Sequence, residues 1–125
     1  MKGKIKYQHL WNKPYFKELY NTYKGMVFRV KNDTSYTQKN IKICDEWCGD
    51  KGFENFYDWS IANGYKKELI KRGNRTINKY SLDRIDCVGN YEPNNCRWTT
   101  WDIQDTNRSK HYIHSKLYLE YKAKL

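Results

Sequence analysis

Apolar side chains recur at helical spacing in the first quarter of the chain. Those that share one face of the expected helix are Phe16, Leu19, Tyr20, Tyr23, Val27 and Val30. Spacing of three and four residues predicts an amphipathic helix, and Pro14 suits its first turn because that turn leaves its amide groups unbonded. Residues 2–31 carry eight lysines and arginines against one glutamate. We therefore expect a basic helical arm over about residues 1–31, followed by a polar, turn-like run over 32–39.

The middle of the chain, about residues 40–65, predicts a strand and a second helix. Ile41–Cys44 alternates apolar and polar residues, as a short strand does. After an expected loop over 50–52, residues 53–62 place four apolar side chains on one side of a helix, and Asn63-Gly64 ends it. The basic stretch 66–79, interrupted by Gly73-Asn74, is expected to be an exposed connection.

The last part of the chain predicts two strands and two helices. The strands are expected over 81–86 and 96–99, with Gly89, Asn90 and Pro93 in the loop between them. The helices are expected over 100–108 and 112–123. Together these elements predict a single α+β domain of 125 residues.

Composition adds a strong positive charge. Twenty-four lysines and arginines stand against 14 acidic residues, a formal net charge of +10. Such a chain attracts polyanions, and that binding weakens as salt rises; the alternative is a merely soluble surface. No run approaches the roughly 20 apolar residues of a membrane span, and the start has no apolar run typical of a secretory signal. We expect a protein of the reducing cytoplasm whose four cysteines are thiols.

Residues 82–107 carry the most specific motif. It reads Leu82-Asp83-Arg84-Ile85-Asp86, then Gly89-Asn90-Tyr91-Glu92-Pro93-Asn94-Asn95-Cys96-Arg97-Trp98-Thr99-Thr100, then Gln104 and Asn107. This motif resembles the HNH endonucleases, in particular the small homing-endonuclease-like proteins encoded by bacteriophages, and a looser likeness covers about residues 15–110. The resemblance implies a ββα-metal core over about 80–109, with flanking helices and one divalent metal between the first strand and the last helix of that core.

The resemblance also implies a role for each motif residue. Asp83 stands where a metal ligand opens the motif, and Asn95 stands where an asparagine braces the loop. Gln104 stands at the metal ligand on the helix, with Asn107 one turn further on. Such oxygen ligands suit Mg²⁺ or Mn²⁺. Arg84 replaces the usual histidine base; it cannot accept a proton, but it can grip a phosphate.

Other interpretations of the same residues remain open. Catalysis can survive with another base or a metal-bound hydroxide, or the scaffold can be a degenerate one that only binds DNA. A third alternative is a protein that docks on the nucleic-acid channel of another protein. Asp83, Arg84 and Asp86 could also be an ordinary surface ion-pair cluster. Four cysteines allow a zinc site in principle, but their spacing is not that of the common zinc knuckles.

The expected partner is double-stranded DNA, with oligomeric state left open. The cations named as phosphate contacts are Arg72, Arg75, Arg84, Arg97, Arg108 and Lys110, together with Lys66, Lys67, Lys71 and Lys79. Contacts of this kind position a protein on the duplex and carry little sequence information. His111 and His114 follow the motif closely enough to offer a substitute base, although a solvated role is the simpler interpretation for both.

Overall fold

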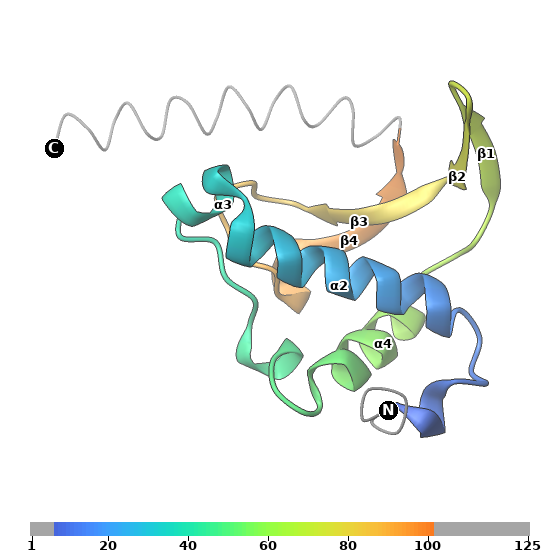
Figure 1. Ribbon diagram of the computed structural model, residues 1–125, viewed down its shortest axis with the longest axis horizontal. Coiled ribbons are helices and arrows are strands. Elements are labelled where there is room, and N and C mark those ends of the chain that lie inside the picture. Colours follow the sequence, from blue (N-terminus) through green and yellow to red (C-terminus); the bar gives the residue numbers. More distant parts are fainter. Residues whose placement is uncertain (1–6, 102–125) are drawn as a thin grey trace, which may run out of the picture. The chain divides into compact units, whose positions relative to one another are not determined.

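The computed structural model describes residues 7–101 and shows mixed α+β structure with two small antiparallel sheets (Figure 1). The helix expected over 112–123 lies outside the described residues. So does the helix expected over 100–108, except for residues 100 and 101. The chain divides into two compact units, residues 1–62 and 63–125, and each is described by itself. In the described part, no helix is both long and apolar enough to span a membrane.

The first unit is helical. Its elements are η1 (Gln8–Leu10), α2 (Phe16–Asn32), α3 (Thr34–Gln38), η2 (Asp45–Trp47) and α4 (Gly52–Ala62). The helix expected from the apolar spacing is confirmed as α2. Tyr15, just before α2, has a left-handed backbone with a φ of 63°. Pro14 therefore precedes the helix, and its expected place in the first turn is wrong.

Two short segments of the first unit differ from expectation. Residues 34–38 form helix α3 rather than a turn, because the Asp33 carboxylate accepts a hydrogen bond of 2.9 Å from the Ser35 amide and caps the helix. Ile41–Cys44 is not a strand: only Ile43 forms an isolated bridge. Four alternating residues do not make a strand without a neighbour to complete a ladder.

Aromatic rings build the core of the first unit. Phe53 on α4 is fully buried, and its ring contacts those of Tyr7, Phe16, Tyr20, Tyr23 and Tyr57. Such tilted and edge-to-face pairs are favourable beyond the area that they bury. At the start of α4, a Cβ on Gly52 would lie 2.5 Å from the carbonyl oxygen of Trp47. Only glycine allows the backbone of η2 to approach α4 so closely.

The second unit consists of two β-ribbons. Its elements are β1 (Leu69–Arg72), β2 (Arg75–Asn78), β3 (Tyr80–Arg84), η3 (Pro93–Asn95) and β4 (Cys96–Thr100). Residues 66–79, which were expected to be an exposed connection, are exposed but form regular secondary structure, because β1 and β2 pair as a hairpin. Gly73 has a φ of 64°, the positive value that a tight two-residue hairpin loop requires at its first position.

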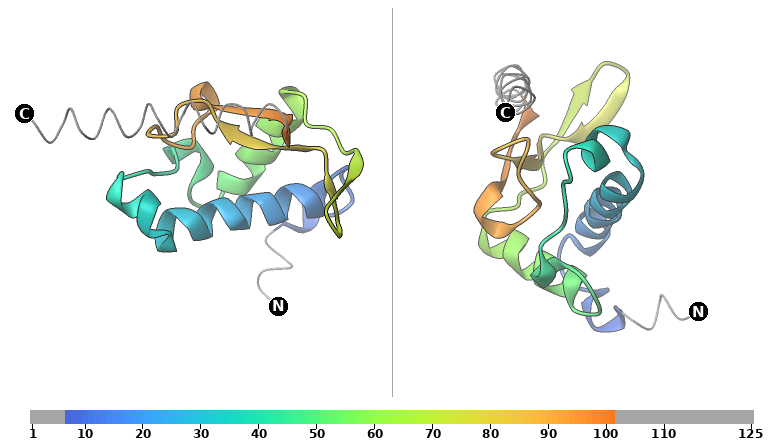
Figure 2. Two further views of the ribbon diagram at one scale, coloured as in Figure 1. Left: turned by 90° about the horizontal axis from the view of Figure 1, so that it is seen from above. Right: turned by 90° about the vertical axis from the view of Figure 1, so that its left-hand side faces the viewer.

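The two strands expected from the motif are confirmed as an antiparallel pair, β3 and β4, within one or two residues of the expected bounds. Residues 85–95 connect them, and η3 closes that loop. The β1–β2 hairpin and the 85–95 loop lie at opposite ends of the β3–β4 ribbon, since β2 leads into the start of β3 and the loop leaves its end (Figures 1 and 2).

Candidate functional site

The expected site lies on the β3–β4 ribbon and its loop. Asp83 is paired with Arg97 across the two strands, and Arg84 is paired with Cys96. Successive side chains of a strand point to opposite faces. Asp83 and Arg97 therefore share one face, while the Arg84 side chain leaves the strand on the other. Consequently, the expected metal ligand and the expected phosphate clamp start from opposite faces of one ribbon.

Asp83 is held by its cross-strand neighbour. Its Oδ2 accepts a hydrogen bond of 3.1 Å from Nε of Arg97, and its side chain is only 13% exposed. Charge-assisted bonds of this kind fix a carboxylate in one orientation. The other oxygen, Oδ1, accepts no hydrogen bond from residues 7–101. A carboxylate oxygen is the kind of ligand that Mg²⁺ and Mn²⁺ prefer.

Arg97 is oriented by the same bond. It uses Nε for Asp83, its side chain is 39% exposed, and its two terminal nitrogens make no other hydrogen bond within the described range. A guanidinium can donate two parallel hydrogen bonds to a phosphate. Arg97 therefore presents donors on the same face as Asp83, beside the carboxylate expected to bind the metal.

Arg84 holds the beginning of the loop. Its Nη1 donates hydrogen bonds of 2.8 Å to the carbonyl oxygens of both Cys87 and Gly89. Its guanidinium lies 5.2 Å from the centre of the ring of Tyr91, which is buried. These contacts give Arg84 a structural role that the sequence did not indicate. Its expected grip on a phosphate stays a prediction.

Asn95 makes the loop hydrogen bonds that its motif position predicts. Its Oδ1 accepts from the Asp86 amide at 2.9 Å, and its Nδ2 donates to the carbonyl oxygens of Asp86 at 3.1 Å and Asn90 at 2.9 Å. The Asn95 carbonyl also accepts from the Ile85 amide at 2.7 Å. A Cβ on Gly89 would lie 2.6 Å from Nδ2. One side chain therefore closes the loop, and glycine leaves the space for it.

Part of the expected metal and DNA site lies outside the described residues. That part comprises Gln104, Asn107, Arg108 and Lys110, with His111 and His114 beyond the motif. Within residues 7–101, His, Cys, Asp and Glu side chains form no group of three or more that could hold a metal ion. Asp83 offers a suitable oxygen, and the remaining ligands of a hard cation there would come from beyond residue 101, from water or from phosphate.

The four cysteines are free thiols, as the sequence predicted. Burial raises the pKa of the Cys44 thiol. Among the described residues, which include all four cysteines, no group of three or more Cys, His, Asp or Glu side chains gathers that could hold a metal ion, so the described side chains give no support to the zinc alternative.

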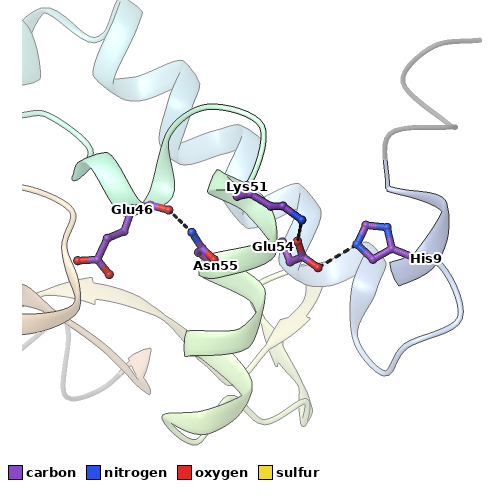
Figure 3. Close-up of polar contacts among 5 residues, drawn as sticks. All are labelled: His9, Glu46, Lys51, Glu54 and Asn55. Atoms are coloured by element: carbon purple, nitrogen blue, oxygen red, sulfur yellow. Dashed lines mark hydrogen bonds and ion pairs between the residues drawn. The ribbon is translucent and has the colours of Figure 1, made fainter.

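A second polar cluster lies in the first unit (Figure 3). Nε2 of His9 lies 2.9 Å from Oε1 of Glu54, and Nζ of Lys51 lies 3.1 Å from Oε2 of the same carboxylate. The His9 hydrogen bond, followed by that of Lys51, lowers the pKa of the Glu54 carboxyl. The neighbouring Asn55 donates to the Glu46 carbonyl at 2.8 Å. Since these bonds tie the η1, η2 and α4 segments together, they give the cluster a structural role.

Asn78, at the end of β2, is an organising residue that the sequence interpretation missed. Its Oδ1 accepts from the Glu68 amide at 2.8 Å, and its Nδ2 donates to the Lys66 carbonyl at 3.0 Å. Its own carbonyl accepts from the indole nitrogen of Trp101 at 2.7 Å. A single asparagine has no sequence signature for such a role. The Gly73-Asn74 pair was a usable signal, because a Gly-Asn pair between two β-prone runs indicates a hairpin.

Comparison with models of protein families, with curated proteins and with solved structures finds no match for this chain.

Proposed function

We propose that this protein is a metal-dependent DNA endonuclease or nickase of the HNH type. The observation that carries the proposal is the loop between two antiparallel strands, closed by the Asn95 side chain, with Asp83 on the first strand. This combination agrees with what the motif implies. The net charge of +10 supports an anionic polymer as the substrate.

In this proposal, residues of one face hold the reacting phosphate. Asp83, together with Gln104 and Asn107 of the motif, would hold a Mg²⁺ or Mn²⁺ ion. When bound, such an ion polarises the phosphate and stabilises the leaving oxygen. Arg97, already oriented by Asp83, donates to a phosphate oxygen as negative charge develops on it. Arg84 keeps the loop in place from the other face through its bonds to the carbonyl oxygens of residues 87 and 89.

A second candidate is a DNA-binding protein without catalytic activity. One specific observation favours it: Arg84 and Asp83 both have protein partners, namely loop carbonyl oxygens and Arg97. An arginine and a carboxylate oxygen that already have protein partners need neither phosphate nor metal. In this alternative the motif residues stabilise the loop, and the positive charge alone accounts for the binding.

Nicking of supercoiled plasmid with Mg²⁺ or Mn²⁺ separates the two candidates. We expect wild type to cut and Asp83→Asn to lose cutting, because the amide keeps the shape but not the charge that a metal ligand supplies. DNA affinity of this variant should be nearly unchanged, since the phosphate contacts come from lysines and arginines. Glu92→Gln is the matched control, because it removes a carboxylate from the neighbouring loop and should still cut.

Arg97 and Arg84 should respond differently. Arg97→Ala should lower the cleavage rate by about 10²- to 10³-fold, as removal of a preorganised donor does, and it should also destabilise the fold because it leaves the largely buried Asp83 carboxylate without its partner. Arg84→Ala should mainly loosen the loop, and Arg84→His tests whether the usual HNH histidine restores or raises activity. If wild type, Asp83→Asn and Arg84→His all leave plasmid intact with each metal, the endonuclease proposal is wrong and the binding proposal stands.

A further inference from the structure

The β1–β2 hairpin concentrates positive charge away from the candidate catalytic face. Residues 66–79 contain six lysines and arginines and only one acidic residue, Glu68. The cations are Lys66, Lys67, Lys71, Arg72, Arg75 and Lys79. The hairpin lies at the end of the β3–β4 ribbon opposite to the 85–95 loop (Figure 2). Its charge is therefore separate from the 85–95 loop that Asn95 closes.

The tip of the hairpin brings two arginines together. Arg72 and Arg75 are directly opposite each other in the strand register, on either side of the Gly73-Asn74 turn, and both are exposed. Like charges directly opposite each other destabilise a two-stranded sheet. An anionic or electron-rich partner at the tip removes this repulsion. The Trp101 ring, 5.0 Å from the Arg72 guanidinium, already provides one such contact inside the protein, and the exposed Arg75 side chain is the one whose charge an anionic ligand would meet.

The cations occupy both faces of the ribbon. Lys71 pairs with Thr76 on one face, while Arg72 pairs with Arg75 on the other. A membrane surface or a flat anionic patch would meet only one of these faces. A DNA groove has phosphates along both walls and base edges on its floor. Charge on both faces and at the tip therefore favours a groove as the partner surface.

The dimensions of the hairpin agree with the major groove. Its four-residue strands rise about 3.4 Å per residue, so they reach about 14 Å. The major groove of B-DNA is about 12 Å wide and about 8.5 Å deep, and it admits a two-stranded β-ribbon. The tip arginines can therefore reach the base edges while the lysines nearer the base of the hairpin stay beside the phosphates.

The hairpin is also held in position for this contact. Asn78 joins its base to residues 66 and 68, and the Lys79 amide donates to the Glu68 carbonyl at 2.6 Å. The Arg72 guanidinium lies 5.0 Å from the centre of the Trp101 ring, and the Trp101 indole donates to the Asn78 carbonyl. A reading element fixed before it meets its partner loses little conformational freedom on binding.

From these observations we propose that the β1–β2 hairpin enters the major groove of double-stranded DNA, where Arg72 and Arg75 read guanines. This inference rests on the proposed function in one respect, that duplex DNA is the partner, and it adds where sequence preference comes from. Arginine donates two hydrogen bonds to O6 and N7 of guanine, whereas phosphate contacts by the lysines are independent of sequence.

The test starts with the full chain in EDTA, so that binding is measured without cleavage. Duplexes enriched by wild type from a random library are compared with an unrelated duplex of equal length. We expect the enriched sites to contain guanines. Arg72→Lys/Arg75→Lys keeps the charge but replaces the rigid planar fork of donors with a flexible ammonium. It should bind the unrelated duplex within about twofold of wild type while losing about tenfold or more of the preference for the enriched site.

Two further comparisons make the test specific. Lys17→Ala/Lys31→Ala, which removes two exposed charges from α2, should keep the preference, whereas Arg72→Ala/Arg75→Ala should lose it. Replacing the guanines of the enriched site with 7-deazaguanine removes the N7 acceptor. This replacement should weaken the binding of wild type to the enriched site by about the same factor as the arginine-to-lysine change does. It should leave the binding of the arginine-to-lysine variant unchanged.

The outcomes distinguish this inference from the proposed function. If wild type binds no duplex DNA, both fail. If wild type binds DNA without any sequence preference, or if the Arg72→Lys/Arg75→Lys variant keeps the full preference, the hairpin inference is wrong while DNA binding stands. Loss of preference in the arginine variants but not in the α2 control supports the inference, whether or not the protein cuts DNA.

Discussion

Replacing Asn95 with alanine should open the loop between β3 and β4. The change removes three hydrogen bonds between the side chain and the loop backbone, at 2.9, 3.1 and 2.9 Å. A hydrogen bond contributes about 0.5–1.5 kcal/mol net, and groups that water can reach lie at the low end. Because the partner groups of Asp86 are on the exposed side of the loop, we expect a loss of about 2 kcal/mol.

A charged replacement sharpens this expectation. Asn95→Asp keeps an acceptor for the Asp86 amide but loses both donors. It also places a carboxylate oxygen against the carbonyl oxygens of Asp86 and Asn90, which now accept from Nδ2. Acceptors that face acceptors are unfavourable. The aspartate variant should therefore be at least as unstable as the alanine variant, although it is closer to asparagine in shape.

Amide hydrogen exchange and urea unfolding measure the effect. The Asp86 amide, which donates to Oδ1, should exchange about tenfold faster or more in Asn95→Ala, since each 1.4 kcal/mol is a factor of ten. Asn94→Ala is the matched control, because this neighbouring side chain is exposed and makes no hydrogen bond in the described part of the chain. Equal unfolding midpoints and equal exchange in the two alanine variants would refute the reasoning.

Three further perturbations have definite expected outcomes. Gly89→Ala should destabilise the same loop, since its Cβ would lie 2.6 Å from Nδ2 of Asn95, and faster loop amide exchange would report it. Phe53→Ala should cost about 3–5 kcal/mol in urea unfolding, as removal of a buried aromatic ring does; Phe28→Ala, 64% exposed, should cost far less. Glu54 has a lowered carboxyl pKa in the folded protein, so its contribution is present above the ordinary glutamate pKa and is lost as pH falls through the lowered one. The stability difference between wild type and Glu54→Gln should therefore shrink on acidification, and a difference that is constant with pH would contradict this.

Elements with a buried face were predictable from the sequence. The spacing of apolar residues located α4 and the end of α2 to within one residue, because burial of one face imposes helical periodicity, but the helical arm expected over about residues 1–31 begins only at Phe16. The β1–β2 hairpin was not predicted, because apolar and polar residues do not alternate regularly along its strands. Only Ile70 and Ile77 pair as apolar residues, and cations fill half of the other positions. Such a ribbon is specified by its turn and by bonds at its base, not by a hydrophobic face.

The candidate site was also predictable only in part. The motif indicated the bonds of Asn95 because its position relative to the two strands determines what its side chain can reach. The partners of Arg84 are backbone carbonyl oxygens, which every residue has, so no sequence pattern marks them. The ion pair of Asp83 with Arg97 depends on strand register, and charge alone does not reveal register.

The way in which the 85–95 loop is closed restricts how this region can change during evolution. The Arg84 side chain donates hydrogen bonds to the backbone of residues 87 and 89, and the Asn95 side chain bonds the backbone of residues 86 and 90. Few residues therefore separate one bonded backbone group from the next. An insertion or deletion within residues 85–90 would displace an anchored backbone group, whereas the exposed side chain at Asn94 is held by none of these bonds. Descendants of this sequence should therefore keep the length of the 85–90 segment and vary more freely at residue 94.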